Sequence, residues 1–252
     1  MNKILLGKKI VSESDKVKIT GNKIYFLADG LYEVEYVEDK KNEIDFIVDG
    51  NVTILEYGFG RHIENNNKYV VKSGELTVNK FYDNEEVLEK VDICLESIDS
   101  SIDYKFSSIC RQVEEYVINV NHKEKDTKSN IVNKAVACEG SKISYVINSN
   151  VPKRSNGSVL EQNTRIVTMG DSDAKICPNM FIDLDDVSAK HGSVIGTFKD
   201  DDIFYLMSKG ISYRDTLKLL IKGFLLSNSV ENHEIRKKII DIIDLYWRWY
   251  DE

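Results

Sequence analysis

Two side chains between Gly170 and Gly210 have the chemistry to bind a soft metal. They are a cysteine, Cys177, and a histidine, His191, on either side of a turn signal at Asp185-Asp186. Thiolate and imidazole groups hold transition metals and iron–sulfur clusters in proteins. We therefore take these two residues as the first candidates for metal ligands.

Three further cysteines, Cys94, Cys110 and Cys138, complete the set of four, and no two of the four form a Cys-x-x-Cys pair. A local zinc knuckle or ferredoxin loop is thereby excluded, so a metal site must combine residues distant in sequence or residues from two chains. We expect Cys94 and Cys110 to be core residues, because an isolated cysteine in a strand is usually buried. The other histidines are expected to have surface or structural roles: His62, His122 and His233.

The composition favours a soluble chain with one domain, or one domain and an appendage. It has 252 residues, 42% hydrophobic and 30% charged, with a net charge of −8. The acidic balance opposes binding to nucleic acid or to an anionic membrane. No apolar run approaches the ~18–20 residues of a membrane span, and no signal peptide is visible. We expect a cytoplasmic protein with reduced thiols.

Residues 1–198 are predicted to be rich in strands, because apolar residues recur at every second position between turn signals. Many short strands at fairly even spacing are typical of a sandwich, a barrel or a β-solenoid, and periodicity alone does not choose among them. Residues 83–96 have an ambiguous spacing that also allows a helix. The clearest alternating segments are 32–36, 44–48, 102–106, 143–147 and 180–184.

Residues 199–252 are predicted to form a helical region. Asp200 to Asp202 place negative charge at the start of a short helix, where the helix dipole favours it. Ser212 followed by Asp215 resembles a capping box for a second helix. A third helix is predicted over 232–250, and its apolar arc is so wide that either the chain's own β-region or a partner protein must cover part of it.

Three blocks of the sequence resemble one family. Residues 185–211 contain Asp-Asp-Val, then His-Gly-Ser, Phe-Tyr-Leu and Ser-Lys-Gly-Ile. Residues 134–145 read KAVACEGSKISY, with a cysteine shortly before Gly-Ser-Lys-Ile-Ser, and residues 161–165 read EQNTR. Taken in their order along the chain, the three blocks resemble segments of the SufB/SufD family, the scaffold proteins of SUF-type iron–sulfur cluster assembly. The resemblance covers residues 130–226. The chain is shorter than a typical SufB or SufD and resembles a reduced, single-scaffold version of them.

The resemblance implies a right-handed parallel β-helix over residues 1–198 and a C-terminal helical region, 199–252, that binds a SufC-like ABC ATPase. It also implies that two β-helix chains pair, as a homodimer or with a SufB/SufD-type partner. A transient iron–sulfur cluster would form at their interface, with sulfur from a cysteine desulfurase. The chain would then be a scaffold and not an enzyme, since the ATPase activity would belong to the partner.

The resemblance also implies roles for individual residues. Cys138 matches the SufB cysteine that receives persulfide sulfur, and His191 matches a histidine at the subunit interface. Ser172 stands where SufB has an interface cysteine, and Cys177 is the nearest replacement thiol. Because a serine hydroxyl is a poor ligand for soft metals, a cluster-free SufD-like subunit that only binds and regulates the ATPase is an alternative. A carbohydrate-active β-helix enzyme is a third hypothesis, disfavoured by the SufB/SufD motifs.

Overall fold

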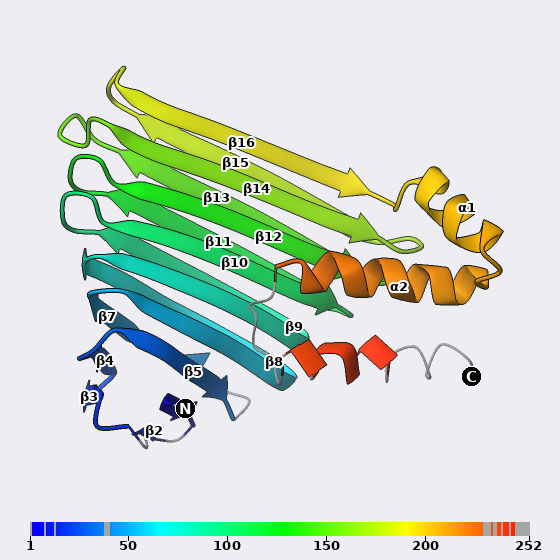
Figure 1. Cartoon of the computed structure of the whole chain (residues 1–252), viewed down its shortest axis with the longest axis horizontal. Coiled ribbons are helices and arrows are strands. Elements are labelled where there is room, and N and C mark those ends of the chain that lie inside the picture. Colours follow the sequence, from blue (N-terminus) through cyan, green and yellow to red (C-terminus); the bar gives the residue numbers. More distant parts are fainter. Residues whose placement is uncertain are drawn as a thin grey trace.

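The computed structural model shows a parallel β-solenoid of about seven coils, followed in the chain by helices that lie along one side of it (Figure 1). It describes residues 2–7, 9–12, 14–37 and 41–228, together with 233, 236, 237, 239–241, 243 and 244. The expected mainly β fold, a parallel β-helix with a C-terminal helical region, is confirmed. The sandwich and the barrel that the strand pattern alone left open are excluded.

Two sheets form the walls of the solenoid. The first sheet has the strand order β16-β14-β12-β10-β9-β8-β5-β1-β2, and the second contains β15, β13 and β11 followed by the other halves of β9 and β8. The long strands β8 (Val52–Ser73) and β9 (Glu75–Leu95) therefore belong to both walls. The second sheet continues from β8 through β7 to β4 and β3.

The remaining strands are shorter. On the N-terminal side they are β1 (Asn2–Leu6), β2 (Ile10–Ser12), β3 (Val17–Thr20), β4 (Lys23–Phe26), β5 (Gly30–Tyr36), β6 (Lys41–Asn42) and β7 (Asp45–Asp49). On the C-terminal side they are β10 (Ser101–Cys110), β11 (Val113–His122), β12 (Lys128–Ala137), β13 (Lys142–Val151), β14 (Ser158–Thr168), β15 (Asp173–Ile182) and β16 (Val187–Gly196).

Successive coils stack in parallel register, so side chains at paired positions face the same way. Inward positions carry large apolar and aromatic residues that stack from coil to coil. The rings of Phe46 and Tyr69 lie 4.9 Å apart, and those of Tyr116 and Tyr145 lie 4.8 Å apart. These aromatic columns fill the space between the two sheets and hold the coils together.

The chain turns sharply from one coil to the next where β8 meets β9. Gly74 has a φ of +75°, and a Cβ there would lie 2.3 Å from the carbonyl oxygen of Gly50. Only glycine tolerates both the left-handed backbone and this close approach. The segment 83–96, for which a helix was possible, is strand and belongs almost entirely to β9.

Two helices follow the last strand. They are α1 (Asp200–Ser208), which begins with the three aspartates, and α2 (Tyr213–Leu226). The predicted cap of α2 is confirmed, because the Ser212 hydroxyl accepts a hydrogen bond from the Asp215 N–H at 3.1 Å. Most of the helix predicted over 232–250 lies outside the described residues, and those described between 233 and 244 are helical. None of the helices in the described ranges is long and apolar enough to cross a membrane.

Candidate functional site

His191 lies on β16, the last strand of the first sheet. It pairs in register with Gln162 of β14, whose side chain is 2% exposed and therefore faces the interior. Paired positions on parallel strands face the same way, so His191 also takes an inward position. Because no described strand follows β16 in this sheet, that interior is open and His191 is exposed.

Cys177 lies on β15, the last strand of the second sheet, but on its outer face. It pairs with Val146, whose neighbours Tyr145 and Ile147 are fully buried and face the interior. Alternation along the strand therefore turns Cys177 away from the interior, where it is partly exposed. The two candidate ligands occupy opposite walls of the terminal coil, and within one chain the structure does not bring them together.

Cys138 directly follows β12, where the solenoid meets helix α2. Its N–H donates to the carbonyl of Cys110 at 2.9 Å, and its side chain is 5% exposed. The thiol belongs to an apolar cluster that includes Val136 and the α2 residues Ile221 and Leu225. Helix α2 therefore covers the predicted sulfur acceptor.

The other two cysteines are buried, as predicted for core residues. Cys94 is 6% exposed, and Cys110 is fully buried with its thiol donating to the carbonyl of Lys142 at 3.3 Å. Burial, reinforced by the nearby Glu114 carboxyl, raises the pKa of Cys110 well above its ordinary value. A thiol with a raised pKa is a weak nucleophile at neutral pH.

Ser172, which the resemblance places where SufB has an interface cysteine, precedes β15. Its hydroxyl oxygen is buried and has no hydrogen-bond partner in the described structure. The next residue, Asp173, donates its N–H to the carbonyl of Ser141 at 2.9 Å, which places Ser172 at the same end of the strands as Cys138. His191 lies in the middle of β16, away from this end.

Polar side chains replace the aromatic columns in the last coils, a feature that the sequence analysis missed. The Gln162 amide donates to the hydroxyl of Ser149 at 2.7 Å, and the Asn133 amide donates to the hydroxyl of Thr164 at 3.0 Å. All four side chains are at most 3% exposed. Gln162 and Thr164 sit in the fully polar tract EQNTR, so no apolar alternation marks which of its residues face inward.

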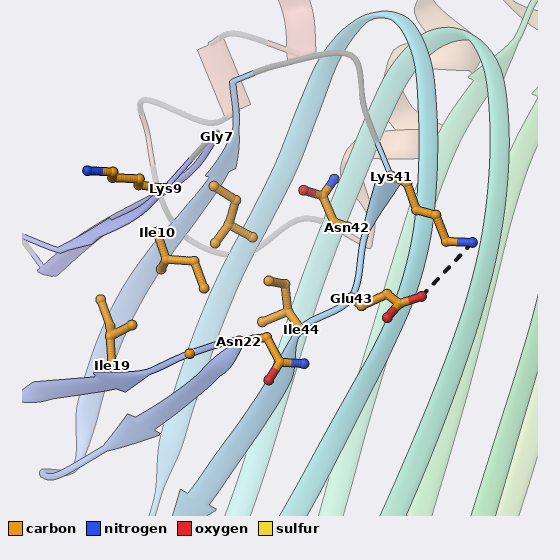
Figure 2. A pocket seen from close by; sticks show the side chains of 11 residues that line it. Gly7, Lys9, Ile10, Ile19, Asn22, Lys41, Asn42, Glu43 and Ile44 are labelled. Atoms are coloured by element: carbon orange, nitrogen blue, oxygen red, sulfur yellow. Dashed lines mark ion pairs between the residues drawn. The ribbon is translucent and has the colours of Figure 1, made fainter.

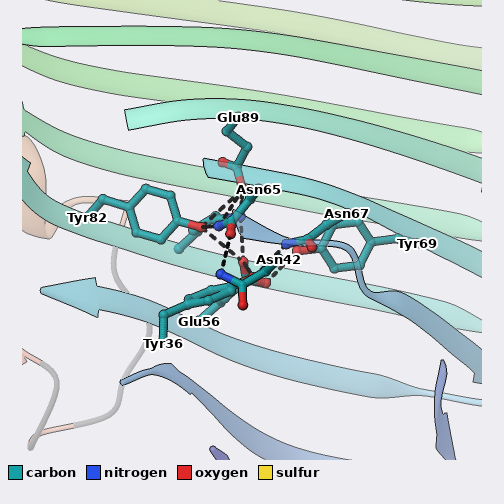
Figure 3. A network of polar contacts seen from close by, with 9 residues as sticks. Tyr36, Asn42, Glu56, Asn65, Asn67, Tyr69, Tyr82 and Glu89 are labelled. Carbon is teal, nitrogen blue, oxygen red and sulfur yellow. Dashed lines mark hydrogen bonds and ion pairs between the residues drawn. The ribbon is translucent and has the colours of Figure 1, made fainter. Parts of the chain in front are cut away.

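A second polar region, also missed, lies deep between the two sheets where β8 and β9 pair (Figure 3). Lys80 forms ion pairs with both Glu56 and Glu89, and all three side chains are nearly inaccessible to water. Three tyrosines, Tyr36, Tyr69 and Tyr82, donate their hydroxyl hydrogens to the two carboxylates.

The protonation of this ion-pair network follows from its burial. Burial alone would lower the pKa of Lys80, but the charges of Glu56 and Glu89 outweigh it and the pKa is raised. Burial raises the pKa of Glu89, against the opposing charge of Lys80. Every charge thus has a partner of opposite sign, and the network has the character of a structural core.

A third buried acid, Glu114, lies close to Cys110. It accepts hydrogen bonds from Ser108 at 2.7 Å and Tyr116 at 3.0 Å. Burial raises the pKa of Glu114 to about 8, although these two hydrogen bonds lower it. The carboxyl is therefore largely protonated at neutral pH.

The histidines other than His191 match the predicted structural or surface roles. His122 is fully buried between the hydroxyls of Thr127 and Ser129, at 2.8 and 2.9 Å, and burial lowers its pKa to about 4. His62 pairs with Glu86 at 3.4 Å on the surface, and the described His233 is exposed.

A cavity of about 470 Å³ lies at the N-terminal end of the solenoid (Figure 2). Its apolar side includes Ile10, Ile19 and Ile44, and its polar side includes Asn42. The Asn42 amide donates to the side-chain carbonyl of Asn65 at 2.9 Å, which connects the cavity wall to the buried ion-pair network. None of the predicted site residues lines this cavity.

The described part of the chain contains no group of three or more histidine, cysteine, aspartate or glutamate side chains positioned to hold a metal ion. His191, the predicted ligand on the open coil, is exposed and therefore accessible to a second molecule.

Helix α1 is mostly exposed, although its Ile203 packs against the apolar cluster between the solenoid and α2. None of its residues is buried, and Phe204 and Tyr205 are 67% and 63% exposed. Exposed aromatic residues of this kind are typical of protein interaction sites. A cavity of about 450 Å³ separates α1, α2 and the strand ends, lined in part by Met169, Phe198 and Leu217.

Comparison with known proteins gives a consistent match. A model of the SUF system FeS cluster assembly SufBD core domain matches residues 62–224. An iron–sulfur cluster assembly SufBD family protein of Mycobacterium leprae is 28% identical over 137 residues, which cover 50% of this chain and 35% of that protein. Its counterpart in Staphylococcus saprophyticus is 27% identical over 116 residues, which cover 45% of this chain and 25% of that protein. The match thus spans about a third or less of these relatives.

Proposed function

The chain belongs to the SufBD family of the SUF iron–sulfur cluster assembly system, and from that membership we propose that it is a scaffold subunit on which a nascent cluster is built between two chains. Iron and sulfide are cargo in this proposal, held for a time and then passed on. The observation that carries it is the open terminal coil, which presents His191 on an inward position beside unpaired strand edges.

The terminal coil favours pairing with a second β-helix, either another copy or a SufB/SufD-type partner. Within the described structure, β15 pairs only with β13 and β16 only with β14, so each leaves one edge free. Free edges of long strands readily pair with another chain. Four large apolar side chains on these strands are also exposed: Phe181, Ile182, Val194 and Ile195.

We assign His191 as the first protein ligand of the cluster. Cys177 is the second, and because it faces outward on the other wall, it would join the same cluster from the second chain. Mixed imidazole and thiolate ligation suits a cluster that must be released, because histidine is protonatable and raises the reduction potential. The second chain supplies the remaining ligands.

Cys138 is proposed to accept sulfur from the persulfide of a cysteine desulfurase. Its thiolate attacks the terminal sulfur of the donor, the S–S bond of the donor breaks, and the donor thiolate leaves. Because α2 covers Cys138, the helix must shift before the donor gains access. Binding of a SufC-like ABC ATPase to α1 and α2 would couple ATP-driven motion to that access.

A cluster-free, ATPase-binding subunit is the second candidate function. Ser172 favours it, because a hydroxyl replaces the thiolate at the family cysteine position.

Anaerobic reconstitution with ferrous iron and sulfide, read by visible absorption, distinguishes the two functions. The scaffold predicts a coloured wild-type protein when it is purified with its ATPase. It also predicts a weakened spectrum in His191→Ala and little change in the control Ser188→Ala, on an outward position of the same strand. A colourless wild-type protein that still binds the ATPase would support the cluster-free subunit instead.

Labelling with sulfur from a cysteine desulfurase tests the acceptor. We expect Cys138→Ser to lose the label and Cys94→Ser, a buried cysteine elsewhere in the solenoid, to retain it. Full labelling of Cys138→Ser would show that another residue accepts the sulfur.

A further inference from the structure

We propose that Gln162 is a positioning residue for His191: its side-chain oxygen accepts the imidazole N–H and leaves the other ring nitrogen free to bind iron. The inference rests on the proposed role of His191 as a cluster ligand. It concerns how the imidazole is oriented before iron arrives.

The register of the last two strands of the first sheet places these side chains next to each other. Gln162 of β14 pairs with His191 of β16, and both take inward positions. On its other side Gln162 pairs with Ile131 of β12, which offers no hydrogen-bonding group. His191 is therefore the polar neighbour of Gln162 within its own column of stacked side chains.

The orientation of the Gln162 amide is fixed by the opposite sheet. Its nitrogen lies 2.7 Å from the Ser149 hydroxyl and 3.3 Å from the main-chain carbonyl of Asn179. A carbonyl oxygen only accepts hydrogen bonds, so the atom that faces Asn179 must be the NH₂ group. The other terminal atom of the Gln162 amide is therefore the oxygen. A flip of the amide that exchanged the oxygen and the nitrogen would lose the hydrogen bond to the Asn179 carbonyl.

That oxygen is buried and has no hydrogen-bond partner in the described structure. An unmet buried acceptor is unfavourable, and such atoms in folded proteins call for an explanation. The His191 side chain is exposed at the open end of this coil. A turn of the imidazole toward Gln162 satisfies the oxygen and fixes which ring nitrogen carries the proton.

A fixed tautomer matters for metal binding. A neutral imidazole has one N–H and one lone pair, and the group that accepts the N–H determines which nitrogen is the ligand. Such supporting hydrogen bonds typically change metal affinity by about 10–100-fold. Docking of a second chain over the terminal coil would also exclude water, which competes for the same N–H.

The first test reads the imidazole directly. The ring nitrogens of the iron-free protein are observed by ¹⁵N NMR, with His191→Ala to assign the signals. We expect one dominant tautomer in wild type and in Gln162→Glu, which keeps an acceptor, and a mixture in Gln162→Leu. The same tautomer distribution in all three proteins would overturn the inference, whether or not wild type binds iron.

The second test measures ferrous iron binding under anaerobic conditions. We expect the iron concentration for half-saturation to rise about 10-fold in Gln162→Leu and to stay near wild type in Gln162→Glu. Thr164→Val, which removes a buried hydroxyl two residues along the same inward face, serves as the matched control. Equal losses in the Leu and Glu variants would show that the amide NH₂ acts structurally through Ser149 and Asn179, which contradicts the proposal.

A wild-type protein that binds no iron would count against His191 as a ligand, and so against the proposed function. The tautomer measurement would still decide whether Gln162 positions the ring. Thermal unfolding of each variant confirms that the solenoid remains folded.

Discussion

The interior of the solenoid is polar in two regions that differ in how their groups are satisfied. Where β8 and β9 pair, Lys80 forms ion pairs with both Glu56 and Glu89. Tyrosine hydroxyls donate to both carboxylates, and one Glu89 oxygen has no hydrogen-bond partner. In the last coils, Gln162 retains an unpaired oxygen and His191 is exposed. The first region is a closed network, in which a cation bridges two carboxylates out of reach of water. The second lies at the open end of the solenoid, where an uncharged amide is next to an exposed imidazole, which is accessible to a ligand or a second chain.

The difference predicts that mutations separate into two classes. Changes in the closed network should alter the free energy of unfolding and leave iron binding unaffected in the protein that still folds. Changes at the open end should weaken iron binding and leave the free energy of unfolding almost unchanged.

The largest expected effect comes from Lys80→Met. The substitution leaves Glu56 and Glu89 buried next to each other without a cation, and removal of one partner from a buried ion pair costs about 3–5 kcal/mol. Urea unfolding followed by circular dichroism measures the loss. A loss below about 1 kcal/mol, the range of exposed ion pairs, would mean that the network is open to water.

The second-largest effect is expected in the pH dependence of the free energy of unfolding, through Glu114. The folded-state pKa of Glu114, about 8, is above the unfolded value near 4.5, so the protonated carboxyl stabilises the fold at low pH and that contribution is lost as pH rises through 8. We expect wild type to lose a few kcal/mol relative to Glu114→Gln between pH 5 and pH 8, since each unit of pKa difference corresponds to about 1.4 kcal/mol. Urea unfolding at each pH measures the difference. If the free energies of unfolding of the two proteins changed equally with pH, Glu114 would not be buried as described.

The smallest effect on stability is expected for His191→Ala. The side chain is exposed, and substitutions of that kind usually change the free energy of unfolding by less than about 0.5 kcal/mol. The same urea experiment provides the measurement. A loss comparable to that of Lys80→Met would assign His191 to the core and erase the contrast between the two regions.

Much of the fold could be predicted from the sequence, because most strands alternate apolar and polar residues and the cap at Ser212 has a local signature. The long strand β9 could not be predicted from the sequence, because its inward positions include the charged residues Lys80 and Glu89. These side chains break the apolar alternation. Their burial is explained by the ion pair that they form with each other across the interior and by the ion pair of Lys80 with Glu56 on the neighbouring coil. This is also why residues 83–96 could be taken for a helix.

For the candidate site, the sequence provides residue types but no geometry. The residue types of Cys177 and His191 pointed to metal chemistry, but their relation depends on which face each strand turns inward. That is set by pairing with residues 31 and 29 positions earlier, Val146 and Gln162. The unmet oxygen of Gln162 has no signature within EQNTR, because it depends on contacts with a strand of the other sheet.

The open last coil also has a consequence for dynamics. In a solenoid each coil is stabilised mainly by its nearest neighbours, so a terminal coil with one neighbour opens more often than an internal one. β16, which carries His191, would then exchange its amide hydrogens faster than β12 in the isolated chain. In the proposed scaffold, a partner docked on β15 and β16 would supply the missing neighbour. Ordering of the coil and assembly of the ligand set would then be one coupled equilibrium, and separation of the two chains would weaken cluster binding at the moment of release.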